Sequence, residues 1–464
     1  MSGFKPLPPA VPLRKLLGPS FIILALGFGS GEIILWPYLT SNFGLGLAWG
    51  ALIGITCQFF INMEIERYAL VKGESVFVGM HKLWPKIVWW FIISTFLGFG
   101  LPGIIAASAQ VFSNLLGISN FKWLAVLLLI GCGILLNFGK TVYESMEKTT
   151  RLIIFIGLPF IIFLVFILTS SSDWVALGRG LVGWGDGYRF LPPGIALATF
   201  LGAFAYSGAG GNLNLTQSIY IREKGYGMGF YAQKISGLFK NIKEQQEIKL
   251  TGEDFEVTDD NIKKFNLWWK RINLEHALIF WLLGFLGICL LMLLSYVTTY
   301  GLLNNTQGIS FVLNEGMAIS TIINPVVSVL FLLVIAVMLW QTQLGILDST
   351  SRIMAENFAL NKIGQGGQIN LSKMYYGFLW AQILFGIILF LFNIYEPRTL
   401  IVVGAVINAV AMFVHVGLVN FMNWRILPPA VRPKVWRRLL IGIIFILFGG
   451  FSVFTLWHQI GKIF

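Results

Sequence analysis

Apolar stretches of about twenty residues, separated by short polar gaps, recur along nearly the whole chain. A helix that crosses the hydrocarbon core of a bilayer needs about 20 apolar residues, so each stretch predicts a membrane span. We count about eleven, at 18–40, 44–63, 87–116, 122–139, 150–170, 190–219, 275–299, 322–350, 373–393, 399–422 and 437–458. The pattern therefore predicts an all-α integral membrane protein with about 11 transmembrane helices.

Composition agrees with this prediction and excludes a soluble protein. The 464 residues are 56% hydrophobic and only 12% charged, with a mean hydropathy of +0.77. Soluble domains carry about 25% charged residues. The net charge of +12 could indicate a nucleic-acid partner, but the basic residues lie in the gaps between apolar stretches and not on a soluble domain.

The sequence predicts no enzyme and no cofactor. Its three cysteines, Cys57, Cys132 and Cys289, lie within apolar stretches and have no partner at a metal or redox spacing. There is no His and acid pair at the spacing of a membrane metalloprotease, and no activated-nucleophile motif.

Lysine and arginine fall mainly in alternate gaps, after the second, fourth, sixth, eighth and tenth stretches. Cytosolic loops carry the excess of positive charge. The N-terminus is therefore predicted to be cytosolic and the C-terminus external, in a plasma or inner cell membrane.

Five regions follow from this division. They are a cytosolic tail (1–17), a first repeat of spans one to five (18–170), a second repeat of spans six to ten (190–221 and 275–422), a cytosolic segment (222–274) and an eleventh span (437–458). Within the segment, 258–273 has the pattern of an amphipathic helix, starting with the cap residue Thr258. It is expected either to lie at the lipid headgroups or to pack under the bundle.

Glycine clusters interrupt the first and the sixth stretches. Span one contains Gly-Phe-Gly-Ser-Gly-Glu at 27–32, and span six contains Ser-Gly-Ala-Gly-Gly-Asn at 207–212. Unwound backbone at bilayer depth is tolerated where it faces a cavity or ligand, and a matched pair of broken spans indicates a transporter site near the midplane. The alternative is close helix packing through small residues. The candidate substrate-binding residues are Gly29, Ser30, Gly31, Glu32, Gly208, Ala209, Gly210, Gly211, Asn212 and Asn214.

Glu32 is the sharpest single candidate, because a carboxylate within a span is costly and marks function by default. It could bind a cation, carry a proton, or cap the second half-helix of span one. We name it as the candidate metal ligand.

Further polar residues lie in spans eight and ten. Gln341, Gln343 and Asn408 are second-rank binding candidates. Asp348 and Arg352 are four residues apart, a spacing that permits an ion pair on a helix face, either as a gate latch or as a plain surface pair.

Several segments of the chain resemble segments of the Nramp divalent-metal transporters. The family has Asp-Pro-Gly-Asn at its first break, where this chain has Gly29 to Glu32. Its span-six Met-Pro-His-Asn-Leu-Tyr-Leu-His aligns position by position with 209–216, and similar segments lie at 67–74 and 341–356. The resemblance implies a five-plus-five inverted repeat of the amino-acid–sodium symporter type, with broken helices one and six.

The scaffold residues match the family, and the chemistry-bearing residues do not. The family's metal-binding Asp and Asn fall on Gly29 and Glu32, and its soft Met falls on Ala209. Its span-six His falls on Gly211, and the Asp and Glu of its proton relay fall on Leu101 and Ile104. The resemblance therefore implies the fold and transport, with a remodelled site whose metal selectivity and proton coupling stay open.

The sequence thus predicts a transporter that moves a small solute, foremost a divalent metal or other small cation, by alternating access. Three alternatives stay open: a carrier of a non-metal polar or anionic solute, which half-helix N-termini would suit, a transport-dead sensor that signals through 222–274, or a passive channel. The expected partners are the solute and membrane lipid, with no nucleic acid, and the chain is expected to be a monomer.

Overall fold

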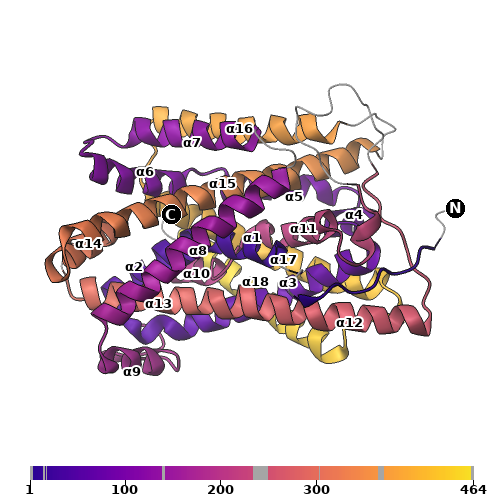
Figure 1. Ribbon diagram of the computed structural model, residues 1–464, viewed down its shortest axis with the longest axis horizontal. Coiled ribbons are helices and arrows are strands. Elements are labelled where there is room, and N and C mark those ends of the chain that lie inside the picture. The colour runs from indigo at the N-terminus through magenta and orange to yellow at the C-terminus, as the bar shows by residue number, and fades with distance from the viewer. Residues whose placement is uncertain are drawn as a thin grey trace.

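The computed structural model describes residues 4–13, 16, 18–137, 142–233, 249–302, 304–363 and 370–460. Figure 1 shows a bundle of long helices that run roughly parallel or antiparallel, with shorter helices at both ends. Among the described residues, β1 (Trp184–Gly185) and β2 (Tyr188–Arg189) form a two-stranded antiparallel hairpin.

The first five spans contain two interrupted helices. Span one is α1 (Pro19–Gly27), the π-helix η2 (Ser30–Leu35) and α2 (Trp36–Phe43), and span three is α5 (Ile87–Phe99) and α6 (Gly103–Leu116). The others are η3 (Leu45–Leu47) with α3 (Ala48–Lys72), then α7 (Lys122–Asn137) and α8 (Val142–Leu168). The short helix α4 (Val76–Leu83) lies between α3 and α5, and the short helix α9 (Ser171–Gly180) follows α8.

The next six spans begin with another broken helix, α10 (Leu197–Ala205), η4 (Gly211–Leu215) and α11 (Thr216–Lys224). Span seven joins α12 (Asp259–His276), η6 (Ala277–Leu283) and α13 (Gly284–Thr299). Then follow α15 (Pro325–Ile363), α16 (Leu371–Leu391), α17 (Pro397–Ile426) and α18 (Val435–Ile460). The short elements are η5 (Gly227–Tyr231), α14 (Ser310–Ile322) and η7 (Pro429–Val431).

Helices are found at all eleven predicted spans. Within the described part of the chain, eight are long and apolar enough to cross a bilayer, α8 and α9 form a bent pair at 114°, and α7 is a shorter apolar helix. Large apolar side chains are exposed along the bundle, among them Phe155, Phe166, Leu439 and Ile446. Surfaces of this kind are covered by lipid, so the chain is an integral membrane protein.

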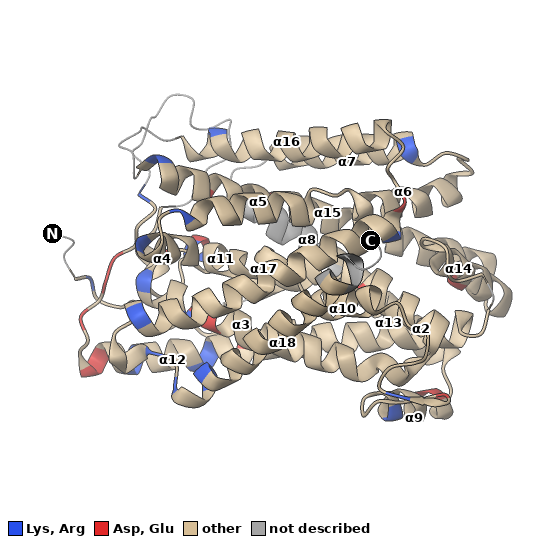
Figure 2. Ribbon diagram, turned by 180° about the vertical axis from the view of Figure 1, so that it is seen from behind, with Lys and Arg blue, Asp and Glu red and all other residues tan. Residues whose placement is uncertain are grey.

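The two ends of the bundle differ in charge. Figure 2 shows most Lys and Arg residues gathered at the end that carries the N-terminal tail, α4 and α12, which we call the basic end. The end with α9 and α14, which we call the opposite end, has few.

Span one lies at the centre of the bundle. Every residue of α1 and η2 is buried, and α1 packs against α15, α8 and η6. A helix that is apolar on all sides is a buried helix, and α1, which is apolar on all sides, is buried in the core.

The amphipathic helix within 258–273 is the basic-end part of span seven. Its cap Thr258 accepts a hydrogen bond from Asn261 N–H, and the helix continues into η6. Trp268 is buried and donates a hydrogen bond to Pro8 O, and Arg271 donates to Ala10 O and Val11 O. The N-terminal tail therefore covers this helix, which packs under the bundle.

Candidate functional site

The first break separates α1 from η2 at Phe28 and Gly29, and Thr342 of α15 holds its end. Thr342 Oγ1 donates to Ala25 O at 3.2 Å and to Phe28 O at 2.7 Å. A Cβ at Gly29 would lie 2.3 Å from Thr342 Cγ2. The absence of a side chain at Gly29 thus lets Thr342 reach the carbonyls that the interrupted helix leaves without partners.

The second break, from Tyr206 to Gly210, is bridged by one side chain of span two. Gln58 Nε2 donates to Ala205 O, and Gln58 Oε1 accepts from Gly210 N–H, both at 3.0 Å. Gly208 and Gly210 have φ of 128° and 71°, values that glycine adopts without strain. Gln58 therefore satisfies the last carbonyl before the break and an amide after it.

The two breaks lie directly against each other. A Cβ at Gly31 would lie 1.8 Å from Tyr206 O, and a Cβ at Gly27 would lie 3.0 Å from Gly208 Cα. Glycine at these positions therefore permits close packing between spans one and six. The two interpretations of the glycine clusters, helix breaks and small-residue packing, both hold.

Glu32 is enclosed at this contact. It is 0% exposed, and neither carboxyl oxygen has a hydrogen-bond partner among the described residues. A Cβ at Gly27 would lie 2.6 Å from Glu32 Oε1. The carboxyl group therefore lies beside the backbone of the first break, where no described basic side chain neutralises it.

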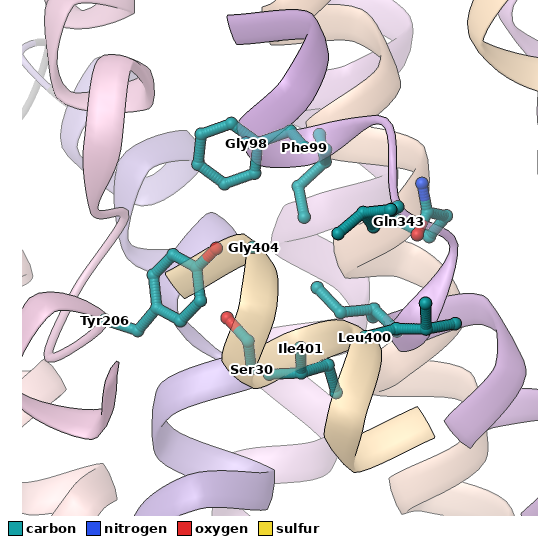
Figure 3. Close-up of a pocket in the computed structure, with 11 residues that line it drawn as sticks. Ser30, Gly98, Phe99, Tyr206, Gln343, Leu400, Ile401 and Gly404 are labelled. Carbon is teal, nitrogen blue, oxygen red and sulfur yellow. The ribbon is translucent and has the colours of Figure 1, made fainter. Parts of the chain in front are cut away.

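A small cavity lies next to the breaks. Figure 3 shows Ser30, Tyr206 and Gln343 at its edge, and Leu101 and Ile104 belong to its apolar wall. Its volume is about 20 Å³, which is room for about one water molecule. The lining residues of α17 are Leu400, Ile401 and Gly404, which come from its first two turns, and this places the cavity on the opposite-end side of the breaks.

Asn212 and Asn408 hold the site together. Asn212 Nδ2 donates to Ser94 Oγ at 2.8 Å and to Thr95 Oγ1 at 3.0 Å. Asn408 Nδ2 donates to Gly98 O at 2.9 Å and to Tyr206 Oη at 2.7 Å. Both amide groups are therefore engaged with span three or with the second break.

The remaining candidates are also buried. Gly211 lies against Asn408, since a Cβ there would be 2.2 Å from Asn408 Oδ1. Ala209 and Gln341 are each 2% exposed, and Asn214 is 0% exposed with neither side-chain polar atom partnered among the described residues.

Sequence reasoning missed Gln58 and Tyr206. The available signal for Gln58 was a single amide within the apolar run 51–61, which a span tolerates when it hydrogen-bonds inward. Tyr206 gave no signal, because its role is to present a backbone carbonyl to Gly31 and a hydroxyl to Asn408.

The interpretation of Asp348 and Arg352 as a surface pair is wrong. Arg352 Nε lies 2.9 Å from Asp348 Oδ1, and its Nη1 lies 2.7 Å from Glu223 Oε1 of α11, with all three side chains at most 2% exposed. Beside them Arg222 pairs with Glu356 at 2.9 Å, and Glu356 also accepts from Ser75. We call these five charged residues the ion-pair network; it joins the second half of span six to span eight near the basic end.

The described residues contain no group of three or more His, Cys, Asp and Glu side chains that could hold a metal ion. Any cation at the breaks would therefore depend on one carboxylate together with backbone, amide and water oxygens.

No protein-family model and no curated protein matches the sequence. Solved structures match the fold. A variant of the manganese transporter of Eremococcus coleocola gives a TM-score of 0.72 at 13% identity, over 99% of this chain and 91% of that one. MhsT in complex with L-phenylalanine gives 0.50 at 14% identity, over 93% and 98%. The chain therefore has the inverted-repeat fold of these transporters, with helices one and six broken as predicted.

Proposed function

We propose that this chain is a secondary transporter that carries a small divalent cation across the cell membrane by alternating access. Glu32 supplies the charge at its site, and the basic end faces the cytosol. The fold supports the proposal, because the chain shares it over almost its whole length with a manganese transporter.

The observation that carries the proposal is the environment of the Glu32 carboxyl group. Its carboxyl group is buried where two broken helices meet, and both of its oxygens lack a partner among the described residues. An unpaired charge is expensive at bilayer depth. A transported cation that binds between the breaks would neutralise it.

The chemistry of the surroundings favours a hard cation. Ala209 occupies the position at which the Nramp family has a methionine. The thioether of that methionine would favour a soft metal. The polar groups nearby are oxygens and amides, from Ser30, Gln343 and the backbone of 29–31 and 208–211. Mg²⁺ keeps several waters and needs only one or two carboxylates, so it fits this set better than a fully dehydrated ion.

The apolar wall of the cavity favours transport without the Asp and Glu proton relay of the Nramp family. Leu101 and Ile104 line it from span three, so no carboxylate of that span faces the cavity. Protons that accompany the cation would need another route.

Uptake into liposomes tests the proposal. The purified protein would be reconstituted as a monomer, with manganese and magnesium supplied separately and a pH dye inside. We expect saturable magnesium uptake, weaker manganese uptake, and loss of both in Glu32→Gln.

Glu315→Gln is the matched control, because Glu315 is also a buried carboxyl, on α14 away from the breaks. It should retain uptake. Folded protein that moves neither metal would overturn the cation proposal and direct the search to polar organic or anionic solutes.

A further inference from the structure

A second group of buried polar side chains lies at the end of α1 that is remote from the break. Ser20 Oγ donates to Glu275 Oε2 at 2.5 Å and lies 2.8 Å from His276 Nδ1. His276 Nδ1 is 3.3 Å from Glu66 Oε1, which also accepts from Gln217 Nε2. We call these five residues the acid–histidine cluster; each is at most 5% exposed.

The acid–histidine cluster brings together elements that are far apart in sequence. Ser20 belongs to α1, Glu66 to α3, Gln217 to α11, and Glu275 and His276 to the end of α12. It therefore connects the first half of span one to spans two, six and seven.

The charges in the cluster are not balanced by any described basic side chain. The ion pairs among the described residues give neither Glu66 nor Glu275 a Lys or Arg partner, and Arg14 and Lys15 lie outside the described residues. The rings of Phe59 and Phe280 stack on His276 at 5.6 and 4.7 Å. Two ionised carboxylates in one dry site repel each other, so the sealed cluster holds at least one proton.

The cluster also has spare hydrogen-bonding capacity. Among the described residues, Glu66 Oε2, Glu275 Oε1, His276 Nε2 and Gln217 Oε1 have no partner. Asn62, one turn before Glu66 on α3, is buried with both side-chain polar atoms unpartnered. A buried acceptor without a donor is rare in folded proteins, and a labile proton would occupy such positions.

Ser20 gives the cluster a mechanical consequence. The nine-residue α1 lies between Gly18 and the break at Phe28 and Gly29, so it is a short rigid element with a glycine near each end. Ser20 connects it to α12 through the two hydrogen-bond contacts named above. Loss of that connection would free α1 at the basic end.

We propose that Glu66, Glu275 and His276 form a proton-binding site that keeps α1 sealed while it is protonated. Opening of α1 hydrates the carboxylates, so the open form tolerates both charges and one proton leaves to water at the basic end. The sealed form binds the extra proton, so acid favours sealing and rising pH favours opening. The inference does not rest on the proposed substrate, because it concerns the empty protein.

Accessibility of α1 tests this site without any cation present. Ile23 is buried in α1, and Ile23→Cys in the full chain would be labelled with a water-soluble maleimide across a pH range. Phe4→Cys, at a position 70% exposed in the tail, serves as the reference for the intrinsic pH dependence of thiol labelling. We expect the Ile23→Cys rate relative to the reference to rise with pH, by up to about tenfold per unit if opening releases one proton.

Variants identify the groups responsible. Glu66→Gln and Glu275→Gln each remove a charge. Each should therefore keep the relative labelling rate of Ile23→Cys low and flatten the dependence of that rate on pH. Ser20→Ala should raise the rate at every pH. Glu315→Gln, a buried carboxyl outside the cluster, should retain the parent profile.

A flat profile in the parent would overturn the proposal, as would an unchanged profile in the folded Gln variants or an unchanged rate in Ser20→Ala. Elution as a single monodisperse peak would identify the folded variants, and Ser20→Ala keeps the test decisive if a Gln variant does not fold. Because no metal is added, failure here is distinguishable from failure of the Glu32→Gln uptake experiment.

Discussion

At the scale of the residue, the chain uses glycine to bring two backbones together beside a carboxylate. Gly31 faces the carbonyl of Tyr206, and Gly27 faces both Gly208 and Glu32. Backbone atoms cannot rotate away as flexible side chains can, so Gly31 tolerates no Cβ without movement of a helix.

Gly31→Ala is expected to lower the free energy of unfolding by about 1–3 kcal/mol, the usual cost of overpacking. Its Cβ would lie 1.8 Å from Tyr206 O. Thermal unfolding in detergent, followed by tryptophan fluorescence, measures the change.

Gly131→Ala is the control, because a Cβ at that position of α7 would meet nothing within 4 Å. It should be neutral or stabilising by up to about 1 kcal/mol. Equal effects of the two substitutions would show that the contact between the breaks is looser than described.

At the scale of the element, each broken helix is held by a side chain from a neighbouring span. Thr342 serves span one, and Gln58 serves span six. The break costs helix hydrogen bonds, and these side chains supply substitutes within the bundle.

Thr342→Val keeps the shape of the side chain and removes the hydroxyl donor. The buried carbonyls of Ala25 and Phe28 then lose their hydrogen bond from this side chain. We expect a loss of about 1–3 kcal/mol in the free energy of unfolding. Thr321→Val, on α14, removes an exposed hydroxyl that donates to Met317 O of its own helix and should cost less than about 0.5 kcal/mol. A similar loss in both would contradict the assigned role of Thr342.

The ion-pair network acts on the same scale, because it fixes α11 to α15. Arg352→Gln leaves Asp348 and Glu223 without their shared partner, and breaking a buried pair of this kind costs about 3–5 kcal/mol. Denaturation of the purified protein would measure the loss. The exposed pair of Lys264 and Asp260 gives the comparison: Lys264→Gln should cost less than about 1 kcal/mol.

At the scale of the whole molecule, the described residues place two buried polar networks on the basic side of the breaks and a small cavity on the opposite side. The ion-pair network and the acid–histidine cluster both lie on the basic side, whereas Ser30 and Gln343 line the cavity. In the proposed transporter, this asymmetry would correspond to a form whose gate at the basic end is closed.

Sided labelling tests this arrangement. Ser30→Cys in proteoliposomes of known orientation should react with an impermeant reagent added at the opposite end, and more slowly when magnesium is present. The expected reduction follows from competition for the space between the breaks. Reaction only from the basic end would reverse the assignment of the closed gate.

Much of the fold was predictable from local pattern. Apolar length located the spans, because a helix must cross a bilayer of given thickness. Glycine clusters located the breaks in spans one and six but not the interruption of span three between α5 and α6. The site was less predictable. Asn212 and Asn408 were expected to bind solute, yet their amides bond to spans three and six, and the role of Gln58 depends on a helix far away in the sequence.

The sequence by itself determined that this is a membrane bundle with two broken spans and one conspicuous carboxylate, since length, hydropathy and glycine content act within a segment. Only the tertiary structure decided which buried charges are paired. Arg352 pairs with Glu223 of another span, whereas Glu32 has no such partner among the described residues. Pairing depends on distances between segments remote in sequence, and a single chain pattern does not encode those distances locally.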